Sequence, residues 1–376
     1  MYIPLVSEIS TWLLLFTVIL AAFYYYCTSF VGVFKTVGIP GPTPWPIVNH
    51  SPELKKHGLS KMLDEWRKTY GNTFGIYGLF PRCATLVTFD TRLLEYVMVK
   101  DFSNFVDRAG RNTTLSSGLF FLNGNAWCRS RHVLSPMFTA GRLKQMLSHV
   151  STSSAGFVSL IKKYKEQKKL IPLKALAARY TSDVIARVGF GVDSKALTDE
   201  NSEFAYHINN FIRIPATRLQ NILRTIGEFF PLVMKAGLRL FNKQVDAILP
   251  ETEKYFVNFV NDAIVNKQKD KSNKDLSTKR KLDMLDMLLD AEVEETNLNN
   301  LKADDRKITR TEVIGNSTIL ILAAFETTST ALSSILYLLA RHEDVQDKVI
   351  EEIDEVLDGK STPSYEDLSK LVYTTQ

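Results

Sequence analysis

Cysteine is scarce in this chain of 376 residues, where only Cys27, Cys83 and Cys128 occur. Three cysteines are too few for a disulfide framework, and such low usage is typical of a reducing compartment. The chain has no Cys-x-x-Cys pair, and its six histidines lack the spacing of a zinc site. The sequence therefore excludes a disulfide-stapled scaffold and predicts no metal held by a local Cys/His motif.

An excess of charge of one sign is also missing, because the formal net charge is only +5. No basic block with interleaved aromatic residues occurs, so we expect no nucleic acid partner. The hydrophobic share of 45% is normal for a packed globular protein. The mild positive charge is compatible with anionic membrane lipid as a partner.

One long stretch near the amino terminus lacks charge altogether. The segment 9–34 is 26 residues long, and about 20 apolar residues suffice to span a bilayer. A cleaved signal peptide is the alternative, but such peptides have a basic amino end and an apolar core of about 7–15 residues. We predict a retained anchor at 9–34 with residues 1–8 in the lumen. Lys35 follows the span and no Lys or Arg precedes it, which places the bulk of the chain in the cytosol.

The segment after the anchor is rich in proline. Pro40, Pro42, Pro44 and Pro46 cannot form a helix and predict a stiff spacer within residues 35–50. Beyond it the apolar periodicity predicts a mainly α fold with a small β-sheet region. Strands are predicted at 73–77 and 85–89, a charged loop at 267–281, and helices at 59–70, 91–100, 143–163, 173–190, 203–213, 251–267, 282–291, 313–340 and 345–357.

Glu326 and Thr327 interrupt an apolar helical segment. From Val313 to Ala340 the only charged side chain is Glu326, and four hydroxyl residues follow it. A buried lone carboxylate is costly, and β-branched or hydroxyl residues are poor in mid-helix. The pair is typical of a proton relay into a dry pocket. Two alternatives stay open, namely a second transmembrane helix at 319–340 and a core helix with a structural glutamate.

Trp127 and Arg131 form a second candidate. They are four residues apart, so on a helix they share a face. An indole N–H and a guanidinium on one face make a donor pair for a carboxylate or phosphate. The alternative is a surface cation packed on an aromatic ring.

In this order, these pieces resemble a microsomal cytochrome P450, a heme-thiolate monooxygenase, and most of all the branch of animal xenobiotic and steroid hydroxylases. The run Ala323-Ala324-Phe325-Glu326-Thr327 resembles the family's Ala-Gly-x-Asp/Glu-Thr helix signature. Trp127-x-x-x-Arg131 is similar to its heme-propionate motif. The segments 102–108, 183–191 and 342–346 also fit, so the resemblance covers the whole chain.

The resemblance implies a partial cytochrome P450 fold over 51–376, heme as cofactor and hydroxylation of a lipophilic small molecule. Electrons would come from an NADPH-dependent flavin reductase, at the endoplasmic reticulum membrane. A substrate pocket would draw on 108–123, 204–249 and the first half of the Glu326 helix. By position, the implied site residues are Arg108, Trp127 and Arg131 at the propionates, Ala323 and Ala324 facing the heme, Thr327 hydrogen-bonding dioxygen at the iron, and Glu326 feeding protons.

Two departures from the family pattern matter. Ala324 stands where the family usually has glycine, which narrows the oxygen groove. The Phe-x-x-Gly-x-Arg-x-Cys-x-Gly loop, which supplies the axial thiolate, and the preceding Glu-x-x-Arg helix do not occur in the 376 residues. The axial Cys ligand is expected beyond Gln376, so we expect a truncated chain that is inactive by itself. The alternative is a non-catalytic, membrane-tethered helical protein that binds a partner.

Overall fold

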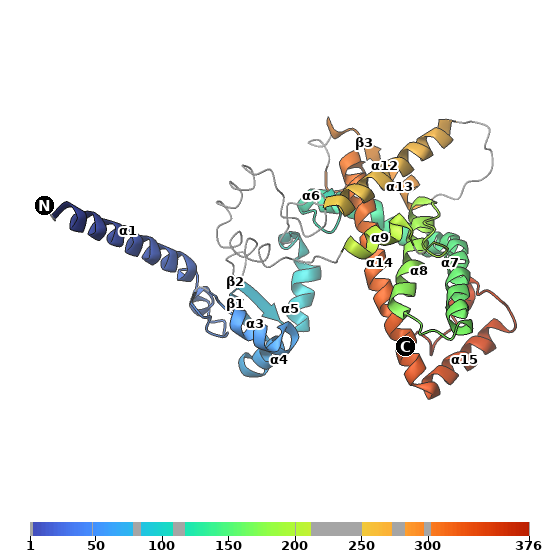
Figure 1. Ribbon diagram of the computed structural model, residues 1–376, viewed down its shortest axis with the longest axis horizontal. Coiled ribbons are helices and arrows are strands. Elements are labelled where there is room, and N and C mark those ends of the chain that lie inside the picture. Colours follow the sequence, from blue (N-terminus) through green and yellow to red (C-terminus); the bar gives the residue numbers. More distant parts are fainter. Residues whose placement is uncertain are drawn as a thin grey trace. The chain divides into compact units, whose positions relative to one another are not determined.

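The computed structural model describes residues 3–46, 48–77, 84–107, 117–199, 201–211, 250–272, 283–296 and 302–375. The chain divides into two compact units. Of the described residues, 3–106 belong to the first unit and 107–375 to the second. Helices dominate both units and strands are few and short (Figure 1), as the sequence predicts.

The first unit begins with helix α1 (Ile3–Thr28), which is long and apolar enough to cross a membrane. Its side chains from Trp12 to Leu20 are largely exposed, as suits a helix surrounded by lipid. The helix ends at Thr28, and a turn precedes the short helix α2 (Val33–Thr36). The predicted uncharged segment 9–34 is therefore not one continuous helix, because hydropathy cannot show where Ser29–Gly32 turns.

The rest of the first unit is a helix pair followed by a hairpin and a further helical segment. The two strands are antiparallel, with Thr73 opposite Thr88 and Tyr77 opposite Ala84. The elements are α3 (Ser51–His57), α4 (Leu59–Tyr70), β1 (Thr73–Tyr77), β2 (Ala84–Thr88), α5 (Thr91–Glu95), η1 (Tyr96–Lys100) and η2 (Phe102–Asn104). The predicted helix 59–70 and the two predicted strands lie within a residue of their expected bounds, the second half of the predicted helix 91–100 is π-helical, and the sequence does not predict α3 or η2.

Strand β1 holds the segment that follows α1. The Tyr77 hydroxyl accepts a hydrogen bond from the Gly32 N–H at 2.8 Å. The Tyr77 ring also packs against Phe30 and Phe34, with centroids 5.5 and 5.6 Å apart. Gly75 must be glycine, since a Cβ there would lie 2.1 Å from the Phe34 ring. We call Tyr77, Phe30, Phe34, Gly32 and Gly75 the aromatic clasp.

The second unit is a helical bundle built around the longest helix, α14, which runs beside α8 (Figure 1). A short parallel pair, β3 with β4, precedes α14. The elements are α6 (Gly124–Leu134), η4 (Ser135–Phe138), α7 (Ala140–Glu166), α8 (Leu173–Phe190), α9 (Glu203–Phe211), α12 (Pro250–Ser272), α13 (Met284–Asp290), β3 (Glu292–Val293), β4 (Ile308–Thr309), α14 (Arg310–Arg341), α15 (Glu343–Leu357) and α16 (Tyr365–Leu368). All seven helices predicted in this unit are present: four are longer than predicted, α8 has the predicted bounds, and the described parts of α9 and α13 are shorter.

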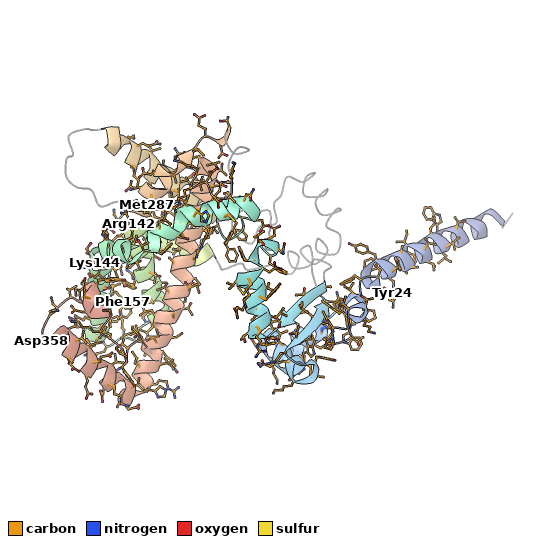
Figure 2. The ribbon with its side chains drawn as sticks, turned by 180° about the vertical axis from the view of Figure 1, so that it is seen from behind. Tyr24, Arg142, Lys144, Phe157, Met287 and Asp358 are labelled. Carbon is orange, nitrogen blue, oxygen red and sulfur yellow. The ribbon has the colours of Figure 1, made fainter. Side chains whose placement is uncertain are left out.

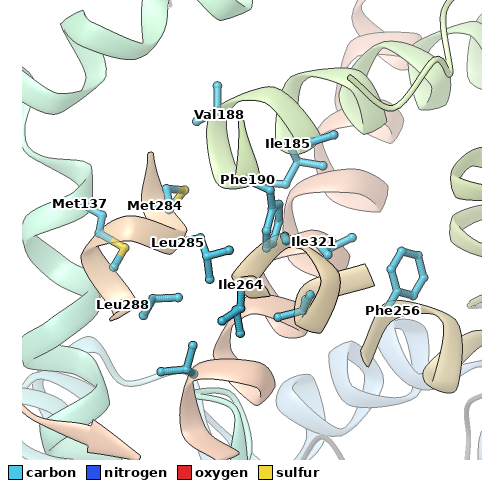
Figure 3. Packing of buried hydrophobic residues seen from close by; sticks show 14 of the residues in the cluster. Met137, Ile185, Val188, Phe190, Phe256, Ile264, Met284, Leu285, Leu288 and Ile321 are labelled. Carbon is cyan, nitrogen blue, oxygen red and sulfur yellow. The ribbon is translucent and has the colours of Figure 1, made fainter. Parts of the chain in front are cut away.

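The core of this unit lies where α8, α12, α13 and α14 meet. Figure 3 shows Phe190, Ile264, Leu285 and Ile321 converging from these four helices. Each buried side chain of this size contributes roughly 1.5–3 kcal/mol relative to an exposed one. The amino-terminal half of α14 is thus a core element, whereas Ile335, Tyr337 and Leu338 in its second half are exposed. By length and composition α14 is also a candidate membrane span, so burial in the first half does not test the alternative of a second span at 319–340.

A cation that the sequence places in an exposed loop is buried in the second unit. Lys267 lies within α12, which continues to Ser272, and its ammonium lies 3.1 Å from Asp286 and also contacts Asp283. The predicted charged loop over 267–281 is therefore wrong at its start. A buried lysine is tolerated only with such carboxylate partners, and local composition does not reveal them.

Two further contacts fix the carboxyl-terminal elements to the bundle. Lys144 of α7, labelled in Figure 2, forms an ion pair with Glu366 of α16. The Glu352 carboxylate in α15 accepts hydrogen bonds from the backbone N–H groups of Tyr373 and Thr374, at 2.6 and 2.8 Å. The last described turn is therefore held against α15.

Candidate functional site

Glu326 lies in the middle of α14, and it is neither alone nor fully buried. Its Oε1 atom lies 3.0 Å from Nζ of Lys174, near the start of α8. The Glu326 side chain is 39% exposed and that of Lys174 is 47% exposed. Glu326 is therefore a paired and partly exposed carboxylate, although it is the only charged residue between Val313 and Ala340. The partner is 152 residues away in sequence, so no local pattern could have revealed it.

Lys174 also binds two of the hydroxyl residues that follow Glu326. Its ammonium donates to Oγ of Ser329 at 3.0 Å and to Oγ1 of Thr330. A lysine ammonium has three donors, and all three have acceptors on this one turn of α14. Two of the four consecutive hydroxyl residues are thus explained by an ion-pair network.

Thr327 points elsewhere. Its hydroxyl donates to the backbone carbonyl of Ala323 at 2.6 Å. The structure describes both the Glu326 and the Thr327 side chains, and no hydrogen bond joins the two. A proton passing between them would need a bridging water.

The small residues before Glu326 lie on two different sides of α14. Ala323 is exposed like Thr327, and the two are one turn apart on the same face. Ala324 is half-buried and packs against the core. Of the predicted heme-facing alanines, Ala323 is thus the one placed beside Thr327.

Helix α8 supports this stretch of α14 at a second point. The buried hydroxyl of Thr181 donates to the Phe325 carbonyl at 3.2 Å. Lys174 contacts the next turn from the same helix. The backbone around Glu326 is therefore held by α8 on one side, while the Ala323–Thr327 face stays open.

The second candidate pair lies on α6. Arg131 is exposed and Trp127, one turn earlier, is half-buried. The arginine between them, Arg129, is buried and forms an ion pair with Glu312 at 2.7 Å. Sequence reasoning missed Arg129, because only its distant partner distinguishes it from its neighbours. The Arg129–Glu312 pair fixes α6 to the start of α14 and leaves the Trp127–Arg131 face outward. Arg108, the third predicted propionate residue, lies outside the described residues.

The segment just before α6 packs closely on α14. Gly118 and Gly315 face each other, and a Cβ on Gly315 would lie 2.2 Å from Oγ of Ser117 and 2.8 Å from the Gly118 nitrogen. The Asn316 side chain accepts a hydrogen bond from the Leu119 N–H at 2.7 Å. This loop and the first half of the Glu326 helix are both predicted to line a substrate pocket, and the structure places them in contact.

The other predicted pocket segment, 204–249, is described only up to Phe211. Phe204 is buried, and its ring packs on Phe256 with centroids 5.6 Å apart. His207 stacks on Tyr255 at 4.1 Å. Burial raises the pKa of Tyr255 to about 12 and lowers the pKa of His207. The described residues of this segment therefore pack against α12 as part of the core.

The donor chemistry of these residues matches one part of a heme site. Trp127 and Arg131 offer N–H donors suited to propionates, and Ala323 with Thr327 offers a small, open face carrying one hydroxyl. The axial side is different. Cys27 lies in α1 and Cys128 in α6, and Cys83 is outside the described residues. Within the described ranges no group of three His, Cys, Asp or Glu side chains could hold a metal ion.

Comparisons with known proteins identify the family of the chain. The family model described as Cytochrome P450 matches residues 39–376. The chain is 31% identical to cytochrome P450 3A6 of Oryctolagus cuniculus over 374 residues, which cover 98% of this chain and 70% of that protein. It is also 31% identical to cytochrome P450 3A5 of Homo sapiens, over 97% of this chain and 69% of that protein. The chain belongs to the cytochrome P450 family.

Proposed function

We propose that this chain carries the distal half of a heme-dependent monooxygenase that hydroxylates lipophilic small molecules. One observation carries the proposal: in mid-α14, Thr327 and Ala323 share an exposed face, and the residue just before Thr327 in sequence is the partly exposed Glu326. A heme bound there would supply the iron at which dioxygen is reduced, with electrons from an NADPH-dependent flavin reductase. Family membership, which implies monooxygenase chemistry, supports the proposal.

Trp127 and Arg131 would hold the heme propionates. On the outward face of α6, Arg131 has no competing ion pair among the described residues. A guanidinium can bind a carboxylate through two parallel N–H donors, which sets both position and orientation. Arg129 would keep α6 in place without touching the cofactor, because its guanidinium is engaged by Glu312.

Thr327 and Glu326 would handle the protons that oxygen reduction consumes. The Thr327 hydroxyl donates to Ala323 now, so it would have to turn to donate into the open face. Glu326 has one carboxylate oxygen on Lys174, while its side chain remains accessible to water. Ala324, where the family usually has glycine, is turned to the core and leaves the Ala323–Thr327 face uncrowded.

An apolar substrate is proposed because the described loop before α6 carries the consecutive apolar residues Leu119, Phe120, Phe121 and Leu122. Phe120 is exposed and contacts Phe121 edge-on, with centroids 5.0 Å apart. Leu119 is fixed to Asn316 of α14. These side chains form an apolar surface on which a lipophilic molecule could bind, and the surface carries no charged group.

We infer that the chain is held in the endoplasmic reticulum membrane by α1, as a single-pass protein whose bulk is cytosolic. The uncharged stretch of α1 after Glu8 and the first basic residue beyond the helix, Lys35, support this topology. The domain boundaries follow as residues 1–8 luminal, 9–34 anchor, 35–50 spacer and 51–376 partial catalytic domain. The Asn-x-Thr triplet at Asn112 tests it: expression in microsomes is expected to leave Asn112 unglycosylated, and a glycan there contradicts the topology.

The 376 residues are proposed to be inactive by themselves, because none of their cysteines has the context of the family's thiolate loop. The test is the absorbance spectrum of the reduced, carbon-monoxide-bound chain after heme addition. We expect no red-shifted thiolate band. The appearance of that band contradicts the proposed inactivity.

A second candidate function is a non-catalytic, membrane-tethered helical protein that binds a partner. The observation in its favour is the position of Cys27 and Cys128, which lie in α1 and α6. Joining a family Glu-x-x-Arg helix and Cys loop after Gln376 separates the two candidates. Heme uptake that is weakened by Arg131→Ala supports the monooxygenase, and no heme uptake supports the binding protein.

A further inference from the structure

We propose that Lys174 is the positioning residue of Glu326: it fixes one carboxylate oxygen on the α8 side of α14 and leaves the other oxygen to take a proton from water. The inference rests on the proposed role of Glu326 in proton delivery. It assigns a function to a lysine that no sequence motif selects. The contacts, the placement on α8 and the exposure of the pair each support it.

The contacts of Lys174 all lie on one turn of α14. Its three donors reach Oε1 of Glu326, Oγ of Ser329 and Oγ1 of Thr330. Ser329 is buried, so this part of the network is anchored away from solvent. With every donor engaged, the ammonium has one position relative to α14, and Glu326 Oε1 is held with it.

The position of Lys174 in α8 suggests that its contact with α14 does more than stabilise α8. Lys174 is the second residue of α8, whose first turn contains no acidic residue. A cation in the first turn opposes the helix dipole and is mildly unfavourable. The lysine therefore violates a local rule, and its compensation is the acceptor set on α14.

The exposure of the pair argues against a purely stabilising role. With side chains 47% and 39% exposed, Lys174 and Glu326 interact through a medium close to water. Such pairs contribute little to folding. Their geometry matters more, because it decides where the carboxylate lies relative to the Ala323–Thr327 face.

The two oxygens of Glu326 then have different roles. Oε1 is bound to Lys174 and also lies 3.4 Å from the Thr330 hydroxyl. Oε2 has no hydrogen-bond partner among the described residues and is free to accept a proton from water. In the proposed role, Oε2 would take up a proton from solvent and pass it through a water toward Thr327, while Oε1 stays bound to Lys174. Of the hydroxyl residues after Glu326, Ser329 and Thr330 serve the lysine, and Thr327 alone serves the open face.

The experiment is isotope-edited infrared spectroscopy of the full chain carrying ¹³C-labelled glutamate carboxylates. The difference between the chain and its Glu326→Gln variant assigns the Glu326 carboxylate band. We expect Lys174→Met to shift this band and Lys174→Arg to restore most of its position, because arginine keeps the charge. Lys169→Met, an exposed lysine just before α8, is the matched control and is expected to leave the band unchanged.

A folded Lys174→Met variant with an unshifted Glu326 band overturns the proposal, since Lys174 would then serve only Ser329 and Thr330. Circular dichroism establishes that the variant is folded. The measurement needs no heme, so its failure is distinct from failure of the proposed function. A shifted band in a chain that never takes up heme, even with a Cys loop added, supports the positioning contact and rejects the monooxygenase.

Discussion

At the scale of single residues, neighbouring arginines on α6 have opposite environments. Arg129 is 3% exposed and paired with Glu312, which is 7% exposed, whereas Arg131 faces solvent. A buried pair is costly to break because the remaining charge has no counterion. Sequence reasoning selects Arg131 for binding, and the structure adds Arg129 as the residue that holds the helix in place.

Arg129→Met is expected to destabilise the second unit by about 3–5 kcal/mol, because Glu312 stays buried without its cation. Arg131→Met, two positions away, is expected to change stability by less than about 0.5 kcal/mol. Denaturant unfolding followed by circular dichroism measures both. Adding Glu312→Gln to Arg129→Met removes the uncompensated charge and keeps an oxygen for the hydrogen bond that Glu312 accepts from the Thr309 N–H at 2.9 Å. The double variant is expected to recover part of the loss, and no recovery would show that the cost is packing rather than charge.

His50 is the residue with the clearest pH effect in the first unit. It is buried against Trp66, with ring centroids 4.8 Å apart, and its Nε2 atom has no hydrogen-bond partner among the described residues. Burial lowers the pKa of His50 below its ordinary value of 6.5, although Glu53 opposes the shift. The unfolded chain therefore binds more protons than the folded chain below about pH 6.5, so stability falls as the pH falls through that value.

We expect hydrogen exchange in residues 51–77, corrected for the intrinsic pH dependence, to show a loss of protection between pH 7 and pH 5. The loss is at most about 1.4 kcal/mol per pH unit, the limit for one proton. His50→Phe keeps the ring and should flatten this dependence. His342→Phe, at the exposed junction of α14 and α15, serves as the control, and a flattened dependence in that variant would contradict the assignment.

At the scale of elements, the crossing of α14 with the loop before α6 depends on two glycines. Gly118 and Gly315 approach so closely that backbone atoms would collide with a Cβ at either position. This close approach brings Leu119 within 2.7 Å of the Asn316 side chain. The loop that carries Phe120 can therefore lie this close to α14 only because Gly118 and Gly315 have no side chain.

Gly315→Ala is expected to cost about 1–3 kcal/mol, as overpacking does in a tight contact. It should also increase hydrogen exchange at Leu119, whose N–H would lose Asn316. Gly141→Ala in α7 is the matched control, since a Cβ there meets nothing within 4 Å, and should be neutral or stabilising by up to about 1 kcal/mol. Equal effects of the two substitutions would rule out the close contact as the cause.

Elements with a clear apolar period could be predicted from sequence, and isolated long-range pairs could not. Helix α8 is present over the predicted range 173–190, because its apolar residues repeat at helical spacing. Lys267 falls at the start of a predicted loop, since nothing nearby in sequence indicates its carboxylate partners. The same limit applies to the site: Thr327 and Arg131 follow from motifs, whereas Lys174 and Arg129 depend on contacts with residues far along the chain.

At the scale of the whole molecule, the proposed role of α1 as a membrane anchor can be tested with charges placed inside the helix. Leu15→Arg with Ile19→Arg places two charges in mid-span, each costing about 2.5–3.5 kcal/mol in a membrane helix. We expect the variant to be extracted from membranes by alkaline carbonate, unlike the unaltered chain. Leu170→Arg, at a side chain 96% exposed between α7 and α8, should stay in the membrane, and its extraction would argue against α1 as the determinant.

The aromatic clasp links the segment after α1 to the β1–β2 hairpin, so the two would move together. Tyr77, Phe30 and Phe34 fasten the end of the membrane helix to β1 through ring contacts and the Gly32 hydrogen bond. A helix that spans a bilayer changes its tilt when the bilayer becomes thicker or thinner. Because Tyr77 joins the segment after α1 to the hairpin, a change in the tilt of α1 would also rotate the hairpin. In the proposed membrane topology, bilayer thickness would therefore affect the orientation of the hairpin, and Tyr77 makes the contacts that link the hairpin to the segment after α1.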